Sequence, residues 1–188
     1  FEVIDGGIVA DDFDRTCEQL QHLSGMADLI ISSGGVSVGE EDYVKAAVEK
    51  LGALSLWKLN IKPGKPLAFG SVGNTPFFGL PGNPTSVFVT FSLLARPYTL
   101  LCQGQTDVEP IVTKAIADFE IKKKGSRQEY LRVKIINDGG QSKAIKFSNQ
   151  SSGVLTSTSW ANALAVLPPE TSVVRGDLVD VILLSGLL

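Results

Sequence analysis

The stretch Ala27–Gly52, "ADLIISSGGVSVGEEDYVKAAVEKLG", decides the fold class. It begins as a short apolar run of the kind that forms a buried strand of a parallel sheet, and this run ends in the glycine pair Gly34–Gly35. Ser37 stands three residues before Glu40, which is the spacing of a helix-capping box, and an apolar stripe of helical period follows. A strand, a glycine-rich turn and a helix in this order predict an α/β fold.

The alternation of strands and helices extends on both sides of this stretch. The run FEVIDGGIV (1–9) predicts a strand, and residues 11–25 predict a helix that ends at a glycine. Further along, SLWKLNIK (55–62) alternates apolar and polar residues. This alternation predicts one strand with Lys58 and Lys62 on the same face.

The rest of the chain divides into two parts. Residues 67–80 predict a hairpin, and the helix after it is expected to kink at Pro97. We therefore expect a three-layer α/β domain over residues 1–104. Short apolar runs separated by turns fill residues 105–188 and predict a small all-β domain of barrel or sandwich type.

Composition excludes several functional classes. A net charge of −3 argues against general binding of nucleic acid or membrane surfaces. Cys17 and Cys102 lie far apart and His22 has no metal-binding companion, so we expect a reducing compartment and no zinc site. The longest apolar run, Val87–Cys102, is interrupted by polar residues, and we expect a cytoplasmic protein. Because the chain starts at Phe1 in an apolar run, we expect it to be a fragment.

One long segment lacks negative charge. No Asp or Glu occurs from Lys50 to Thr106, although the whole chain has 20 acidic and 17 basic residues. Lys58, Lys62 and Lys65 fall in this segment. A lysine about 4 Å from an anion contributes roughly 4 kcal/mol at an effective dielectric near 20, so three around one pocket would bind an oxyanion or phosphate. The alternative is a solvated edge strand whose lysines prevent aggregation.

Two strand-to-helix loops, SSGGVSVGEED (32–42) and LPGNPTS (80–86), could bind such an anion. Free N–H groups and the helix dipole attract anions at helix N-termini. Neither loop carries a P-loop or dinucleotide-binding motif, and a turn that serves only packing is the alternative for each. The candidate ligand-binding residues in these loops are Gly34, Gly35, Ser37, Pro81, Gly82, Asn83 and Pro84.

Acidic residues cluster where two helices are expected to start, and most are interpreted as helix caps. Asp42 follows the glycine loop, where a carboxylate beside anions commonly holds Mg²⁺ or a proton. The basic run KKKGSRQEYLR (122–132), which includes Arg132, is expected to be solvated.

Three blocks together resemble the MoeA family of molybdopterin molybdenumtransferases, to which the gephyrin E domain also belongs. They are SSGGVSVGEEDYV, WKLNIKPGKPLAFG and GLPGNPTSVFVTF. The resemblance implies a MogA/MoaB-like α/β domain followed by a barrel-like β domain. It also implies a cytoplasmic homodimer that inserts molybdate into adenylylated molybdopterin and releases AMP in a Mg²⁺-dependent step. A molybdopterin adenylyltransferase is an implied partner.

The resemblance also implies roles for individual residues. Lys58 and Lys62 match catalytic residues that bind the oxyanion or phosphates, and Pro81 and Pro84 would shape the adjoining wall. Asp11 and Asp42 match acidic positions with catalytic or metal-binding roles, and Ser152 in QSSG matches a residue offered by the β domain. Glu40 replaces an aspartate of many relatives, and the upstream GDEL-type motif is missing, so we expect the fragment alone to be weak or inactive.

Two alternatives remain beside this interpretation. A molybdopterin adenylyltransferase resembles the α/β domain, but it lacks the β domain. A gephyrin-like scaffold would use the same module for dimerisation or peptide binding, and it would tolerate substitution of Lys58 and Asp42.

Overall fold

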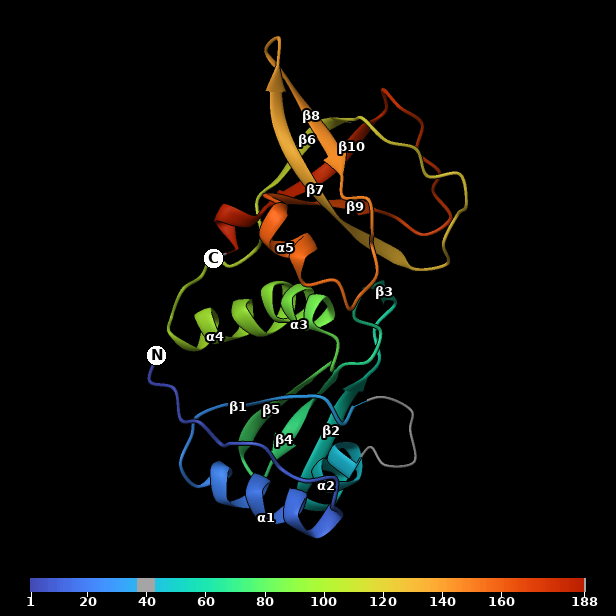
Figure 1. Ribbon diagram of the computed structural model, residues 1–188. Helices are drawn as coiled ribbons and strands as arrows, with labels where there is room; N and C mark the ends of the chain where they lie inside the picture. Colours follow the sequence, from blue (N-terminus) through green and yellow to red (C-terminus); the bar gives the residue numbers. More distant parts are fainter. Residues whose placement is uncertain (37–42, 188) are drawn as a thin grey trace. The chain divides into compact units, whose positions relative to one another are not determined.

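The computed structural model describes residues 1–36 and 43–187, and their contacts divide the chain into two compact units (Figure 1). Unit 1 comprises Phe1–Leu59 and Gly64–Asn83, and unit 2 comprises Asn60–Pro63 and Pro84–Leu188. The helical residues that follow Asn83 therefore group with the β domain by their contacts, although the sequence pattern continues from the α/β domain into them.

Unit 1 is an α/β unit built on a mixed sheet with strand order β1-β5-β4-β2. Strands β1 and β5 are parallel, and the other neighbours are antiparallel. Its elements are α1 (Phe13–Ser24), β1 (Ile30–Ser33), α2 (Tyr43–Leu51), β2 (Gly52–Trp57), β4 (Ala68–Val72) and β5 (Thr75–Leu80). The expected hairpin forms between β4 and β5, where Gly73 has a φ of 57°.

Helices α1 and α2 pack against the sheet of unit 1. Cys17 and Leu20 of α1 join Ala47 and Val48 of α2 in one buried cluster with apolar side chains of β1, β4 and β5. Asp12 caps α1, because its carboxylate accepts a hydrogen bond from the backbone N–H of Arg15 at 2.8 Å. The capping box predicted at Ser37 and Glu40 lies outside the described residues.

Two predicted strands are wrong. Phe1–Val9 forms no strand, because the side chain of Asp5 accepts a hydrogen bond from the N–H of Gly7, whose φ of 71° turns the chain. The run 55–62 is not one strand either. Strand β2 ends at Trp57, and the φ of 74° at Lys58 is incompatible with an extended backbone.

Unit 2 is a closed five-stranded barrel with an added strand and helices. Strands β7-β8-β6-β10-β9 pair in this order and β9 pairs back with β7, while the short strand β3 pairs in parallel with β7. The barrel interpretation of the sequence is therefore confirmed. The strands are β3 (Ile61–Lys62), β6 (Val112–Ala117), β7 (Gln128–Asp138), β8 (Gln141–Lys146), β9 (Ala163–Leu167) and β10 (Leu178–Leu183).

One irregular helix packs on this barrel. It consists of α3 (Pro84–Thr90), the π-helical turn η1 (Phe91–Ala95) and α4 (Arg96–Cys102); α5 (Thr156–Trp160) and η2 (Leu184–Gly186) complete the unit. Pro97 has no N–H to donate to the carbonyl of Leu93, and the π-helical turn lies at this point. Val89 packs with Leu164, Ile182 and Leu184.

Among the described residues, one helical stretch has the length and composition of a membrane span. It runs from Pro84 to Cys102 with a mean hydropathy of 1.2, which is longer than the run considered from sequence. Core helices reach the same values, and the packing of Val89 against the barrel fits a core helix.

We predict that Gly79→Val destabilises unit 1 by about 1–3 kcal/mol, because a Cβ atom there would lie 2.6 Å from Val36 Cγ1 and 3.1 Å from both Ala68 Cβ and Phe77 Cε1. Urea unfolding of the chain measures the change. Gly25→Ala is the matched control, since its nearest neighbour is the His22 carbonyl oxygen at 3.5 Å. Equal stability of the two variants would contradict the close packing at Gly79.

Candidate functional site

The two glycine-containing loops of unit 1 meet at one edge of its sheet. Parallel strands β1 and β5 end at paired positions, Ser33 opposite Leu80, and the N–H of Gly34 donates to the carbonyl of Leu80 at 3.1 Å. A Cβ atom on Gly82 would lie 3.6 Å from the Cα of Gly34. Ligands in open α/β sheets bind beyond the carboxyl ends of the strands, which is where these loops lie.

The adjacent glycines of the first loop serve different purposes. Gly34 has a φ of 85° and open space around it, so its backbone conformation is the reason for glycine. Gly35 also has a positive φ, 66°, and in addition a Cβ atom there would lie 2.5 Å from Val44 Cγ2, so a side chain would collide with α2. The packing alternative therefore accounts for Gly35, whereas Gly34 leaves backbone accessible.

Lys58 and Lys65 lie on neighbouring backbone segments of unit 1. The N–H of Lys58 donates to Leu67 O at 3.0 Å, and the N–H of Leu59 donates to Lys65 O at 2.8 Å. Both lysines are exposed, and Lys58 holds the left-handed φ of 74°. That conformation costs a non-glycine residue about 1–2 kcal/mol, and such strained residues gather at functional sites.

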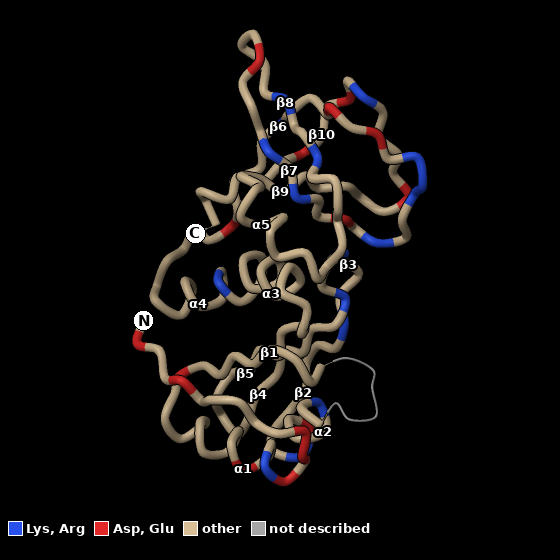
Figure 2. The backbone as a smooth tube through the Cα atoms, in the orientation of Figure 1, with Lys and Arg blue, Asp and Glu red and all other residues tan. Residues whose placement is uncertain are grey.

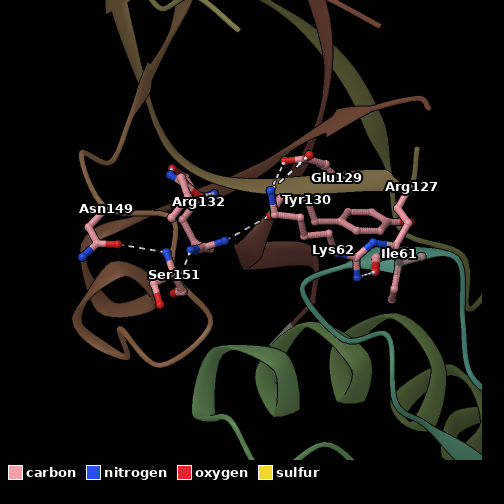
Figure 3. Close-up of polar contacts among 9 residues, drawn as sticks. Ile61, Lys62, Arg127, Glu129, Tyr130, Arg132, Asn149 and Ser151 are labelled. Carbon is pink, nitrogen blue, oxygen red and sulfur yellow. Dashed lines mark hydrogen bonds and ion pairs between the residues drawn. The ribbon is translucent and has the colours of Figure 1, made fainter. Parts of the chain in front are cut away.

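Lys62 belongs to unit 2 and points toward an acidic partner. Its Nζ atom lies 3.2 Å from each carboxylate oxygen of Glu129, the residue opposite it in the β3–β7 ladder (Figure 3). Arg127 Nη1 donates to Ile61 O at 3.2 Å and fixes the same segment. Lys58 and Lys62 thus do not project side by side from one strand, as the sequence predicted.

The segment around Ser152 contacts the start of helix α3 within unit 2. The N–H of Thr85 donates to Ser152 O, and the Thr85 hydroxyl donates to Val154 O, both at 3.1 Å. One of the free N–H groups expected to attract an anion near Pro84 is therefore already bonded to the QSSG segment.

Arg132 is the residue that the sequence interpretation missed. It was expected in a solvated basic run, but its side chain is 1 % exposed. The guanidinium donates to Ser157 Oγ at 3.1 Å. It also donates to Ser151 O at 3.2 Å and to Tyr130 O at 3.4 Å (Figure 3). Its place between Leu131 and Val133 is ordinary for a solvent-facing residue of an alternating strand, so the sequence carries no clear signal of its burial.

The charge of Arg132 is balanced by dipoles rather than by a carboxylate. Among the described ion pairs none includes Arg132, and burial lowers the pKa of its guanidinium to about 10. The group therefore remains protonated at neutral pH. A buried cation next to the QSSG segment is suited to an anionic ligand.

The acidic candidates are only partly placed. Asp11 is exposed beside the cap residue Asp12, while Ser37 and Asp42 lie outside the described residues. Within the described part of the chain no group of three or more His, Cys, Asp or Glu could hold a metal ion. Figure 2 shows the tube from β2 to α4 without acidic residues, as the sequence requires.

Two family models match the chain. Residues 1–100 match the probable molybdopterin binding domain, and residues 114–184 match the MoeA C-terminal region, domain IV.

Individual proteins match both units. A molybdopterin molybdenumtransferase of Haemophilus influenzae is 41 % identical over 171 residues, which are 90 % of this chain and 42 % of the relative. The molybdenum cofactor synthesis protein cinnamon of Drosophila melanogaster is 39 % identical and covers 88 % of this chain and 28 % of its own length. A crystal structure of the molybdopterin biosynthesis MoeA protein from Pyrococcus horikoshii has a TM-score of 0.76 at 28 % identity, over 95 % of this chain and 42 % of that one. The chain spans less than half the length of these relatives.

We predict that Arg132→Lys lowers the free energy of unfolding by about 1–3 kcal/mol, because a lysine cannot donate the three hydrogen bonds made by the buried, fork-shaped guanidinium of Arg132. Urea unfolding measures this change. The control is Arg175→Lys, whose side chain is 70 % exposed and pairs with Asp118 at 3.1 Å; it should change stability by no more than about 0.5 kcal/mol. Equal effects of the two substitutions would refute a structural need for the buried fork.

Proposed function

Because the chain belongs to the MoeA family, we propose that the protein containing it inserts molybdate into adenylylated molybdopterin and releases AMP. The observation that carries this proposal is the succession of both domain models in one chain. A molybdopterin adenylyltransferase would need only the first domain, so the second domain favours the insertion step. The names of the relatives from Haemophilus and Drosophila point to the same biosynthetic route.

The proposed substrates are anions, and both units offer them positive or neutral surfaces. In unit 1 the loops at Gly34 and Pro81–Asn83 present backbone at the carboxyl edge of the sheet, near a segment without acids. Lys58 and Lys65 are exposed and would bind phosphate or oxyanion groups of the substrate. In this proposal Gly35 and Ser37, which belong to the first of these loops, also take part in substrate binding.

Unit 2 carries candidate groups of its own. Lys62 supplies an ammonium, Pro84 borders the start of α3, and Ser152 offers a hydroxyl on a segment held by Thr85. The buried guanidinium of Arg132 adds positive charge beside that segment. The Lys62 ammonium and the Ser152 hydroxyl can each donate a hydrogen bond to a molybdate or phosphate oxygen, and such charge-assisted hydrogen bonds are the strong ones.

The family also suggests Mg²⁺, with Asp11 and Asp42 as its ligands. The described residues alone do not form such a site, since no group of three or more His, Cys, Asp or Glu among them could hold a metal ion. On the strength of the family resemblance, the proposal also includes Mg²⁺. It further includes a cytoplasmic homodimer that cooperates with a molybdopterin adenylyltransferase.

We predict that Lys58→Ala lowers molybdate-dependent AMP release at least tenfold, because removal of one ammonium near a phosphate costs more than about 1.4 kcal/mol. The assay uses a hybrid in which this chain replaces the matching segment of the Haemophilus influenzae relative. The chain alone should release little or no AMP, since it spans 42 % of that relative.

Lys124→Ala is the control, because Lys124 is exposed in the basic loop of unit 2 and should be dispensable. If the hybrid releases AMP and Lys58→Ala changes nothing, Lys58 is not part of the site. If the hybrid binds the pterin nucleotide without any molybdate-dependent release, a scaffold role replaces the enzymatic one.

A further inference from the structure

The carboxylate of Glu129 forms an ion pair with Lys62, a lysine that we propose binds an anion. Both of its carboxylate oxygens lie 3.2 Å from Lys62 Nζ, so the contact is two-pronged (Figure 3). The two residues are ladder partners, with Ile61 opposite Gln128 and Lys62 opposite Glu129. The contact therefore follows from the register of β3 against β7 and not from two freely moving surface side chains.

The carboxylate of Glu129 is confined on its other side. A Cβ atom on Gly125 would lie 2.6 Å from Glu129 Oε1, so the carboxylate sits against the backbone of the basic loop. The same loop is fixed by a hydrogen bond from the N–H of Glu170 to Gly125 O at 2.7 Å. The Glu129 side chain is 15 % exposed, whereas that of Lys62 is 48 % exposed. The acid is thus the fixed member of the pair, and the ammonium is the accessible one.

This arrangement leaves the ammonium able to bind a second partner. An ammonium has three N–H donors, and a carboxylate held at two oxygens occupies at most two of them. Lys62 need not leave Glu129 in order to contact an oxyanion. An oxyanion bound there would, however, lie close to the negative charge of Glu129, and like charges repel strongly where water is partly excluded.

From this geometry we propose that Glu129 is a positioning residue that holds Lys62 in place and lowers its affinity for oxyanions. The inference rests on the proposed role of Lys62 in substrate binding. It adds a function for an acidic residue that pairs with a lysine of the segment Lys50–Thr106, which itself contains no acidic residue. A site for a small dianion must release as well as bind its ligand, and a built-in carboxylate limits how tightly the lysine retains it.

Glu129→Gln tests this inference, because it keeps the length of the side chain and removes the charge. Isothermal titration with sodium molybdate should give a dissociation constant about tenfold lower for Glu129→Gln than for the unsubstituted chain, at low ionic strength. The matched control is Asp180→Asn, which removes one charge from the exposed Lys114–Asp180 pair on the same barrel. The control should leave the constant unchanged.

A double substitution separates this inference from the proposed function. Lys62→Met should weaken molybdate binding, and Glu129→Gln added to Lys62→Met should then have no further effect. If Lys62→Met binds molybdate like the unsubstituted chain, or if that chain binds none, the proposed role of Lys62 fails and the inference fails with it. If Lys62→Met weakens binding but Glu129→Gln leaves it unchanged or weaker, only the inference is overturned.

A second measurement needs no ligand. Acetic anhydride modifies free amines, and mass spectrometry reports the extent of modification at each lysine. Lys62 should be modified at least threefold faster in Glu129→Gln than in the unsubstituted chain, while Lys65 should react equally in both. An unchanged rate at Lys62 would show that Glu129 does not hold the ammonium in solution and would overturn the proposal.

Discussion

The pairing of β3 with β7 is the constraint on which the position of Lys62 depends. Asn60–Pro63 leaves the α/β unit and becomes a strand beside the barrel, held by two register pairs and by hydrogen bonds from Gln128 N and Arg127 Nη1. Lys58 takes its left-handed conformation directly after the end of β2, one residue before the chain leaves unit 1 at Leu59. The ladder with β7 then sets where Lys62 lies.

The cationic side chains described above differ in how their charge is stabilised. Lys58 and Lys65 are exposed, so water solvates their ammonium groups and screens their attraction to an anion. Arg132 is buried, and carbonyl and hydroxyl oxygens accept hydrogen bonds from its guanidinium. Burial lowers the pKa of this guanidinium to about 10. An anion near Arg132 would face a preorganised charge, whereas an anion near the lysines would first have to order flexible side chains.

Much of the fold followed from periodicity, and the failures have local causes. The strand before Gly34, the helices on either side of it, the hairpin at Gly73 and the barrel strands all show the expected period or turn residue. The strand expected at Phe1–Val9 failed because Asp5 and Gly7 form a turn. The strand expected at 55–62 had the right alternation, but alternation does not reveal that a chain changes partner sheets midway.

The site was predictable as a set of loops and charges, but not in its contacts. Sequence placed Gly34 and Pro81–Asn83 at strand ends, and the parallel register of β1 and β5 brings those ends together. The burial of Arg132 was not predicted, because strand alternation places its side chain on the face opposite Leu131 and Val133, and that face was expected to meet water. That face is covered by α5 and by the segment at Ser151, which come later in the chain.

The chain passes between its two units after Leu59, after Pro63 and after Asn83, and this path limits how such a protein could have arisen. A simple end-to-end fusion of two genes produces a single crossing. Here β3 lies within the sequence of the α/β unit and α3 follows that unit directly, yet both belong to the unit that contains the barrel. Recombination at one junction therefore cannot replace either unit as a whole, and we expect the two units to be inherited together.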